Sequence, residues 1–282
     1  MPTHGLPRYA RNDGTAAVSH DEKLVIARSV ATRQSMWLTP DWPAPNGVHA
    51  ICTTRAGGVS ALPYDSLNLG DHVGDSPAHV AANRAIFQQA IGAHPVFLSQ
   101  VHGTQVVQLD ASSPDGTVAD ACVTDQSGLA CTVMVADCLP VLFATAQGHR
   151  VAAAHAGWRG LAGQGGVGIL EATVRHLQAN DILAWLGPCI GPQAFEVGDE
   201  VRAAFIATDA KAADCFKPLT PGKWLADLAA LARLRLRALG IHQIYGNDSS
   251  AAWCTVGNAS RFFSYRRDRV TGRFCASIWR GV

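Results

Sequence analysis

The sequence is poor in charged residues and carries almost no net charge. Only 16% of its 282 residues are Asp, Glu, Lys or Arg, against roughly 25% in an average soluble domain. The 23 Lys and Arg residues nearly balance the 22 Asp and Glu residues, which leaves a formal net charge of +1. This balance argues against a basic surface for nucleic acid and against a polybasic face for membranes. With 48% hydrophobic residues, the bulk of the chain is also not expected to be disordered.

Long hydrophobic runs and paired cysteines are also missing. No apolar run approaches the roughly 18 residues that a transmembrane helix needs. The N-terminal stretch MPTHGLPRYARNDG lacks the apolar core of a secretory signal. The eight cysteines are widely spaced and form no CxxC motif, so we expect reduced thiols rather than a disulfide framework. These absences together predict a cytoplasmic globular protein.

The texture of the chain changes near Met36. Residues 1–35 are polar and have no stable period, which predicts a flexible tail, or residues upstream of a start at Met36. We expect residues 36–282 to form one catalytic domain.

Apolar periodicity predicts a mixture of strands and helices in that domain. A strand is expected over 48–54, and a helix from Ser76-Pro77 to about Ile91. The apolar runs VFLSQV, TQVVQL, ADACVT, ACTVMVA, LPVLFATA and RVAAAHA have the composition of buried strands. Further helices are expected near 169–179, 198–207 and 223–239, and a last strand at SIW, over 277–279. The fold class is therefore α/β, a single-domain mixed-sheet sandwich with flanking helices.

One late segment mixes aromatic and basic residues, SRFFSYRRDRVTGRF over 260–274. Such a mixture can bind RNA, but it is also typical of a strand that covers the core and has a solvated face. The net charge of +1 favours the strand.

Three segments place a potential metal ligand where a strand meets a loop. They are SQVHG with His102, VADCLP with Cys138 and AAHAGWRG with His155. Two imidazoles and one thiolate suit zinc, with a fourth position open for water or substrate. The same residues could instead provide a Cys138–His155 dyad of nucleophile and base. Taken singly, each is also common as a structural core residue, and periodicity does not separate these readings.

Arginines beside glycine turns are a second signal. Arg55 lies in TTRAGGVS, and Arg159 in GWRGLAG before a glycine-rich stretch. A guanidinium group next to free backbone amides would hold a phosphate or carboxylate, although surface arginines on turns are common. Asp137 is expected to support the site from behind Cys138. Cys189, in GPCIGP, is expected to pack in a rigid turn.

Seven ordered motifs give the chain a resemblance to a known family. TTRAGGVS, YDSLNLG, SQVHG, ADCLPVLF, AAHAGWRG, LGPCIGPQAFEVG and FFSYRRD resemble the laccase-domain family over about Trp37 to Val282. Its members are also labelled multicopper polyphenol oxidases and purine nucleoside phosphorylases. The resemblance implies a fold related to the cysteine-hydrolase-like toxins, and a zinc site with catalytic residues at His102, Cys138 and His155. It implies substrate or phosphate contacts at Arg55, Asn68 and Arg159. The glycine stretch GLAGQGGVGIL is longer than the family's usual turn.

The function that the resemblance implies is zinc-dependent phosphorolysis of adenosine, inosine and methylthioadenosine, together with adenosine deamination. A related bacterial member edits cytoplasmic peptidoglycan precursors, so a Cys–His amide hydrolase is the alternative. A third hypothesis is a binding protein whose site is inactive. The copper oxidase label fits poorly, because multicopper enzymes need further histidine clusters and the sequence has no HxH motif. We expect small-molecule partners, nucleosides and phosphate, and a monomer or small homo-oligomer.

Overall fold

The central strands are buried on both faces, and their side chains alternate between two apolar layers. In the computed structural model, which describes Met1 and residues 36–281, β4 (Ala121–Thr124) shows this clearly. Ala121 and Val123 point into one apolar layer, and Cys122 points into another. Side chains of a strand alternate between its faces, so a strand that is buried on both faces requires a layer on either side.

The larger sheet has six strands in the order β12-β8-β6-β7-β4-β3. The β3–β4 and β8–β12 pairs are parallel, and the others are antiparallel. The bounds are β3 Val106–Gln108, β4 Ala121–Thr124, β6 Leu139–Thr145, β7 Val151–Ala156, β8 Ile182–Leu186 and β12 Gln243–Gly246.

The second sheet has four strands in the order β1-β13-β5-β2, and only its β2–β5 pair is parallel. The bounds are β1 Val48–Cys52, β2 His94–Phe97, β5 Leu129–Val135 and β13 Phe274–Arg280. One apolar core contains residues of both sheets, among them Val133 of β5, Leu142 of β6 and Ala276 of β13. The two sheets therefore pack face to face.

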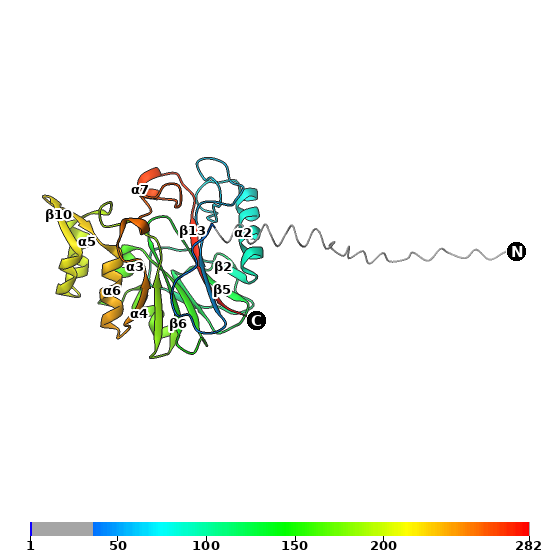
Figure 1. Cartoon of the computed structure of the whole chain (residues 1–282), viewed down its shortest axis with the longest axis horizontal. Coiled ribbons are helices and arrows are strands. Elements are labelled where there is room, and N and C mark those ends of the chain that lie inside the picture. Colours follow the sequence, from blue (N-terminus) through cyan, green and yellow to red (C-terminus); the bar gives the residue numbers. More distant parts are fainter. Residues whose placement is uncertain (2–35, 282) are drawn as a thin grey trace.

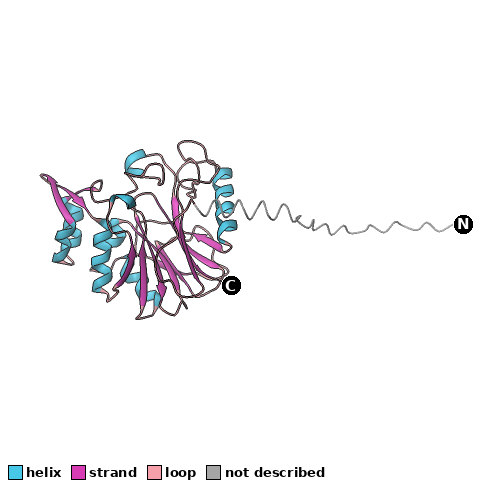
Figure 2. Cartoon of the chain, in the orientation of Figure 1, coloured by secondary structure: helices cyan, strands magenta, loops and turns pink. Residues whose placement is uncertain are grey.

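Helices cover the outer faces, as Figure 2 shows. Helix α2 (Pro77–Ile91) packs Phe87 and Ala90 against the four-stranded sheet. Helices α4 (Ile169–Leu177) and α6 (Leu228–Ala238) cover the six-stranded sheet. The shorter helices are α3 Trp158–Ala162, α5 Asp199–Ile206, α7 Tyr265–Asp268 and the 3-10 helices η1 Ala210–Cys215 and η2 Ala251–Trp253.

A small antiparallel sheet extends from one end of the molecule beside α5 (Figure 1). Its order is β10-β11-β9, with bounds β9 Glu196–Gly198, β10 Phe216–Thr220 and β11 Lys223–Ala226. This sheet corrects the predicted helix over 223–239. Gly222, with φ of 74° in the left-handed region, turns the chain between β10 and β11. Helix α6 begins only after Asp227, whose carboxylate caps the amide of Ala230.

The outcome for the remaining elements is mixed. The predicted helices near 77–91, 169–179 and 198–207 are confirmed, as is the last strand. The apolar runs predicted as buried strands all contain a strand, but β3, in the run TQVVQL, is only partly buried. The strand predicted over 260–274 is wrong. That segment is mostly loop around the short helix α7, which begins after Ser264, and β13 starts only at Phe274. Phe262, Phe263 and Phe274 are buried there, so the aromatic residues do cover the core, but from a loop.

Two further predictions concern the ends of the chain and membranes. The predicted tail over 1–35 lies outside the described residues except for Met1. Among the helices that the structure describes, none is long and apolar enough to cross a membrane.

Candidate metal centre

The register of three neighbouring strands brings two of the predicted ligands together. Strand β7 lies between β4 and β6, and is antiparallel to both. His155, near the end of β7, is paired with Pro140 at the start of β6, so Cys138 lies just beyond this pair. On the other side, Asp120 directly precedes β4, and its carbonyl accepts a 2.7 Å hydrogen bond from the amide of His155.

The third ligand lies on the loop between β2 and β3. His102 adopts a left-handed backbone conformation, with φ of 61°, which is uncommon for a residue with a side chain. The amides of Val101, His102 and Gly103 donate to the carboxylate of Asp120, at 3.1, 2.9 and 2.7 Å. One buried carboxylate therefore holds this loop in place.

Asp120 also orients the buried histidine. Its Oδ1 lies 2.8 Å from Nδ1 of His155, and both side chains are almost completely buried. Nδ1 is thereby engaged, which leaves Nε2 as the ligand atom. The hydrogen bonds from His155 and the loop amides outweigh the effect of burial, and lower the pKa of Asp120.

Two glycines allow the segment after β7, including the start of α3, to approach the ligands and the loop of His102. A Cβ atom on Gly157 would lie 2.8 Å from Cδ2 of His102 and 3.1 Å from Sγ of Cys138. A Cβ atom on Gly160 would lie 2.6 Å from the carbonyl oxygen of Gly103. A larger residue at either position would displace the neighbouring loop.

The three predicted ligands converge. The ligand atoms of His102, Cys138 and His155 all lie within 4.8 Å of one another. Sγ of Cys138 is 3.7 Å from Nε2 of His102, and the two imidazole rings meet edge to face.

The charges of these groups stabilise one another. Burial alone would raise the pKa of the Cys138 thiol, but the positive charge of His155 and the hydrogen bond to His102 lower it to about 6. Burial alone would lower the pKa of His155, but the Cys138 thiolate and the Asp120 carboxylate raise it to about 9. Near neutral pH the pair is therefore a thiolate beside an imidazolium.

The donor set fits a tetrahedral metal ion. Zinc bonds of about 2.0 Å to nitrogen and 2.3 Å to sulfur require ligand atoms roughly 3.5 Å apart. The 3.7 Å between Sγ of Cys138 and Nε2 of His102 is close to that value, and no separation among the three ligand atoms exceeds 4.8 Å. Three protein ligands leave the fourth position open, as in catalytic zinc sites.

The trio faces a cavity of about 580 Å³, which is within the usual size of small-molecule sites. Part of its lining is apolar, namely Trp158, Ile190, Phe195 and Leu228. Another part is polar and basic, namely His72, Tyr265, Arg266, Arg269 and Arg273. An aromatic ring and an anionic group of one ligand could therefore be bound in the same cavity.

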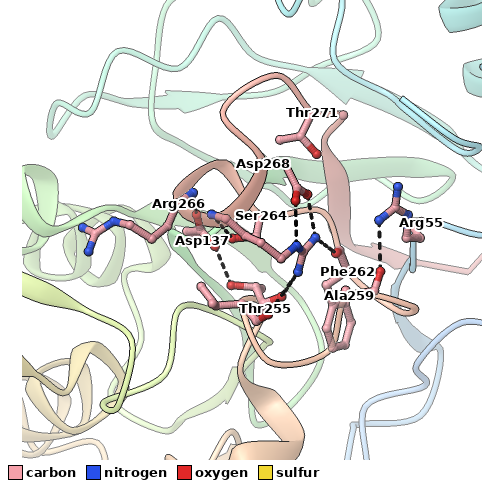
Figure 3. Close-up of polar contacts among 12 residues, drawn as sticks. Arg55, Asp137, Thr255, Ala259, Phe262, Ser264, Arg266, Asp268 and Thr271 are labelled. Atoms are coloured by element: carbon pink, nitrogen blue, oxygen red, sulfur yellow. Dashed lines mark hydrogen bonds and ion pairs between the residues drawn. The ribbon is translucent and has the colours of Figure 1, made fainter. Parts of the chain in front are cut away.

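All three predicted substrate contacts lie outside the cavity lining. Arg55 donates to the carbonyl of Ala259, as Figure 3 shows. It also donates to the carbonyl and carboxylate oxygens of Asp65. Asn68 is fully buried, and its amide oxygen accepts from the amides of Gly70 and Arg273. These two residues hold loops rather than offering free donors to a ligand.

Arg159 is placed differently. It is exposed, and its guanidinium lies 4.5 Å from the ring centroid of Trp158, which lines the cavity. Of the three, it is the residue beside the cavity wall.

Asp137 supports the site and Cys189 packs in a turn, as expected. Figure 3 shows Asp137 accepting hydrogen bonds from the Thr255 hydroxyl and from the backbone amide of Arg266, at 2.6 Å each. Asp137 thereby ties the loop before Cys138 to helix α7. Cys189 is buried in its turn.

Sequence reasoning missed Asp120 and the arginines around α7. Asp120 precedes a buried strand that pairs with the strand of His155, and only the register reveals its role. The arginines belonged to the segment interpreted as a strand. The mixture of arginine and aromatic residues in that segment was the sequence feature that could have indicated a binding surface.

Comparisons with known proteins agree with one another. A family model described as multi-copper polyphenol oxidoreductase laccase matches residues 49–281. A purine nucleoside phosphorylase of Pseudomonas aeruginosa is 51% identical over 246 residues, which are 86% of this chain and 98% of that protein. The purine nucleoside phosphorylase YfiH of Escherichia coli is 51% identical over 250 residues, 87% of this chain and 99% of that protein.

Solved structures show the same likeness. The crystal structure of a Neisseria meningitidis protein matches with a TM-score of 0.82 and 48% identity, covering 87% of this chain and 99% of that one. YlmD from Geobacillus stearothermophilus matches with a TM-score of 0.79 and 33% identity, covering 87% and 96% of the two chains.

Proposed function

The chain belongs to the multi-copper polyphenol oxidoreductase laccase family, and on that premise we propose that it is a purine nucleoside phosphorylase. Its substrates are adenosine, inosine and methylthioadenosine, and it also deaminates adenosine. The observation that carries the proposal is the convergence of His102, Cys138 and His155 on a cavity of about 580 Å³. Relatives named purine nucleoside phosphorylase, about half identical over nearly their whole length, support it.

The proposed reaction transfers a ribosyl group to phosphate. A phosphate oxygen forms a bond to the anomeric carbon of the ribose while the bond from that carbon to the purine nitrogen breaks. The electron pair of the broken bond goes to the purine, which takes up the proton released from the phosphate. The products are the free base and ribose 1-phosphate or, from methylthioadenosine, 5-methylthioribose 1-phosphate.

The apolar wall has the chemistry to hold the purine. Trp158 and Phe195 offer aromatic surface, and Ile190 and Leu228 offer aliphatic surface. Purine rings stack well on aromatic side chains. The proposed position of the base is therefore against this wall.

The three ligands are proposed to hold zinc. His102 and His155 would bind it through nitrogen and Cys138 through its thiolate, with Asp120 fixing the orientation of His155. When bound, zinc would supply Lewis acidity and activate water for deamination. Among the residues that the structure describes, this trio is the one such cluster, which disfavours a multicopper oxidase.

A second candidate function rests on one specific contact. The 2.8 Å contact of Asp120 with His155, together with the adjacent Cys138 thiolate, is the arrangement of a Cys–His–Asp hydrolase. In that case the Cys138 thiolate forms a bond to the amide carbonyl carbon of a nucleotide-linked peptidoglycan precursor while the C–N bond breaks and the amine leaves with a proton from His155. Water then hydrolyses the thioester and frees the thiolate, and a relation to the cysteine-hydrolase-like toxin fold would suit this reaction. Zinc on the thiolate would then inhibit the reaction, whereas it supports the proposed phosphorylase.

The test follows inosine and adenosine by chromatography, with and without phosphate, on purified protein of known zinc content. Phosphate-dependent release of hypoxanthine or adenine together with ribose 1-phosphate, lost in His102→Ala, is the expected result. Arg175→Gln, an exposed change on α4, is the matched control. No turnover either with stoichiometric zinc or after zinc removal would refute the proposal and favour the hydrolase.

A further inference from the structure

Three arginines lie on the basic side of the cavity, and they differ in their partners. The segment around α7 contributes Arg266, Arg269 and Arg273 to the lining. Arg266 is engaged, because its guanidinium donates to the carbonyls of Ala194 and Glu196. Within the described part of the chain, Arg269 and Arg273 take part in no ion pair with a carboxylate.

Arg273 is held in a fixed position. Its amide donates to the side chain of Asn68 at 2.8 Å, and Nη1 caps the carbonyls of Thr271 and Gly272. A Cβ atom on Gly70 would lie 2.7 Å from Cγ of Arg273, so this glycine makes room for the stem of the arginine. Asn68, which the sequence pointed to as a substrate contact, thus acts by positioning Arg273.

Part of the guanidinium of Arg273 remains available. Only Nη1 bonds to protein acceptors among the described residues, which leaves the Nε and Nη2 edge for a ligand. Two adjacent N–H donors of a guanidinium match two oxygens of a phosphate group. A partly buried cation without a counter-ion is costly, and a bound anion would remove that cost.

The arginine also lies close to the metal ligands. Burial lowers the pKa of Arg273, while the charges of Cys138, Asp137 and Tyr265 act in the opposite direction. His72, another lining residue, has its pKa lowered by burial and then by the charge of Arg273. Arg273 and the three ligands line the same cavity, so an anion on Arg273 would lie inside it.

We propose that Arg269 and Arg273 form a subsite for a phosphate group. As part of the proposed phosphorylase, which this inference deepens, the group is the inorganic phosphate that attacks the ribose. Arg273 would bind it through the Nε and Nη2 edge. Arg269, exposed and next to Tyr265, would add the second positive charge. Arg55 does not compete for this role, because Asp65 and Ala259 occupy its donors.

Steady-state kinetics test the assignment. Arg273→Gln and Arg269→Gln are expected to raise the KM for phosphate, for Arg273→Gln by about 10- to 100-fold. The KM for inosine should change little. Arg273→Lys should bind phosphate more tightly than Arg273→Gln but less tightly than the wild type, because lysine keeps the positive charge and lacks the two adjacent N–H donors of the guanidinium. Arg175→Gln removes an exposed charge on α4, outside the cavity lining, and should change neither the KM for phosphate nor the KM for inosine. An unchanged KM for phosphate in both glutamine variants would overturn the proposal.

Direct binding separates this inference from the proposed reaction. Titration calorimetry with inorganic phosphate, and in a second arm with uridine 5′-monophosphate, requires no turnover. Phosphate binding that is weakened in Arg273→Gln and in Arg269→Gln supports the subsite even if phosphorolysis is absent. Binding of the nucleotide alone, with the same dependence on the arginines, supports a phosphate-group subsite but assigns it to a nucleotide substrate. Binding of neither compound to the wild-type protein, or equal binding to all variants, would overturn it.

Discussion

Asp120, directly before β4, lies opposite His155 of the antiparallel strand β7, and two hydrogen bonds join the residues. The backbone amide of His155 donates to the carbonyl of Asp120 at 2.7 Å, and the imidazole Nδ1 meets the carboxylate at 2.8 Å. The same carboxylate accepts from the loop that carries His102. Asp120 therefore connects two of the three ligands of the candidate metal centre without belonging to it.

Replacement of Asp120 should weaken metal binding. In Asp120→Asn the imidazole loses its charged partner, and we expect the zinc affinity to fall by about 10- to 100-fold, as for other residues that orient a ligand. Competition with a chromophoric chelator measures the affinity. Asp41→Asn, at an exposed position, is the control. Equal zinc affinity of Asp120→Asn and the wild type would contradict this role.

Gly157 tests the packing of the site. In Gly157→Ala the new methyl group would lie 2.8 Å from the ring of His102 and 3.1 Å from the sulfur of Cys138. One ligand must move, so we expect loss of stoichiometric zinc while the circular dichroism spectrum stays that of the wild type. Gly257→Ala, where the nearest atoms are 3.9 Å away, should keep its zinc. Full zinc occupancy in Gly157→Ala would contradict the expectation that zinc binding requires the close packing of Gly157 against His102 and Cys138.

The reactivity of Cys138 should follow its lowered pKa. In metal-free protein the thiol has a pKa of about 6, so its alkylation by iodoacetamide should stay fast at neutral pH and slow down as the pH falls through about 6. Cys215, whose pKa burial raises to about 11, should react slowly throughout this range. Peptide mass spectrometry follows both residues, and added zinc should protect Cys138. A midpoint near 8.5, the value of an ordinary thiol, would refute the proposed ion pair.

A buried ion pair stabilises the glycine-rich loop after α3. Glu171 accepts from Nε of Arg235 at 2.8 Å and from the amide of Gly168 at 2.8 Å, while Arg235 also donates to Gly166. Removal of one partner of a buried pair costs roughly 3–5 kcal/mol. We expect Glu171→Gln to lower the free energy of unfolding by about 3 kcal/mol, measured by urea denaturation. Glu200→Gln, at an exposed position, should change it little, and an equal effect of the two changes would exclude this role for the pair.

The sequence was sufficient for the elements whose signals are local. Helix α2 follows Ser76-Pro77, and β7 is an apolar run that ends in a glycine turn. Local signals failed at 223–227, because pairing with β9 and β10 outweighs helix propensity over β11. They failed again around α7, because the loop before β13 is determined by contacts with distant residues such as Asp137.

In the candidate metal centre, the ligands could be predicted from local sequence and the residues that position them could not. His102, Cys138 and His155 stand out because each is a ligand residue at the end of an apolar run. Asp120 and Arg273 do not stand out, because their roles depend on register and on a contact with Asn68 that spans most of the chain. Chemistry can be inferred from residue types, whereas positioning requires the pairing of distant segments.

The alanines of β7 have a consequence for how the sheet finds its alignment. Ala152, Ala153 and Ala154 carry identical side chains but point alternately into two different apolar layers. A shift by one residue would exchange alanine for alanine in this stretch, so these three side chains do little to exclude the wrong alignment. The same shift would place the imidazole of His155 in the apolar layer under helices α4 and α6, and Asp120 would lose its contact with Nδ1. The contact between Asp120 and His155 therefore favours the observed alignment of the central strands, in addition to orienting the metal ligand.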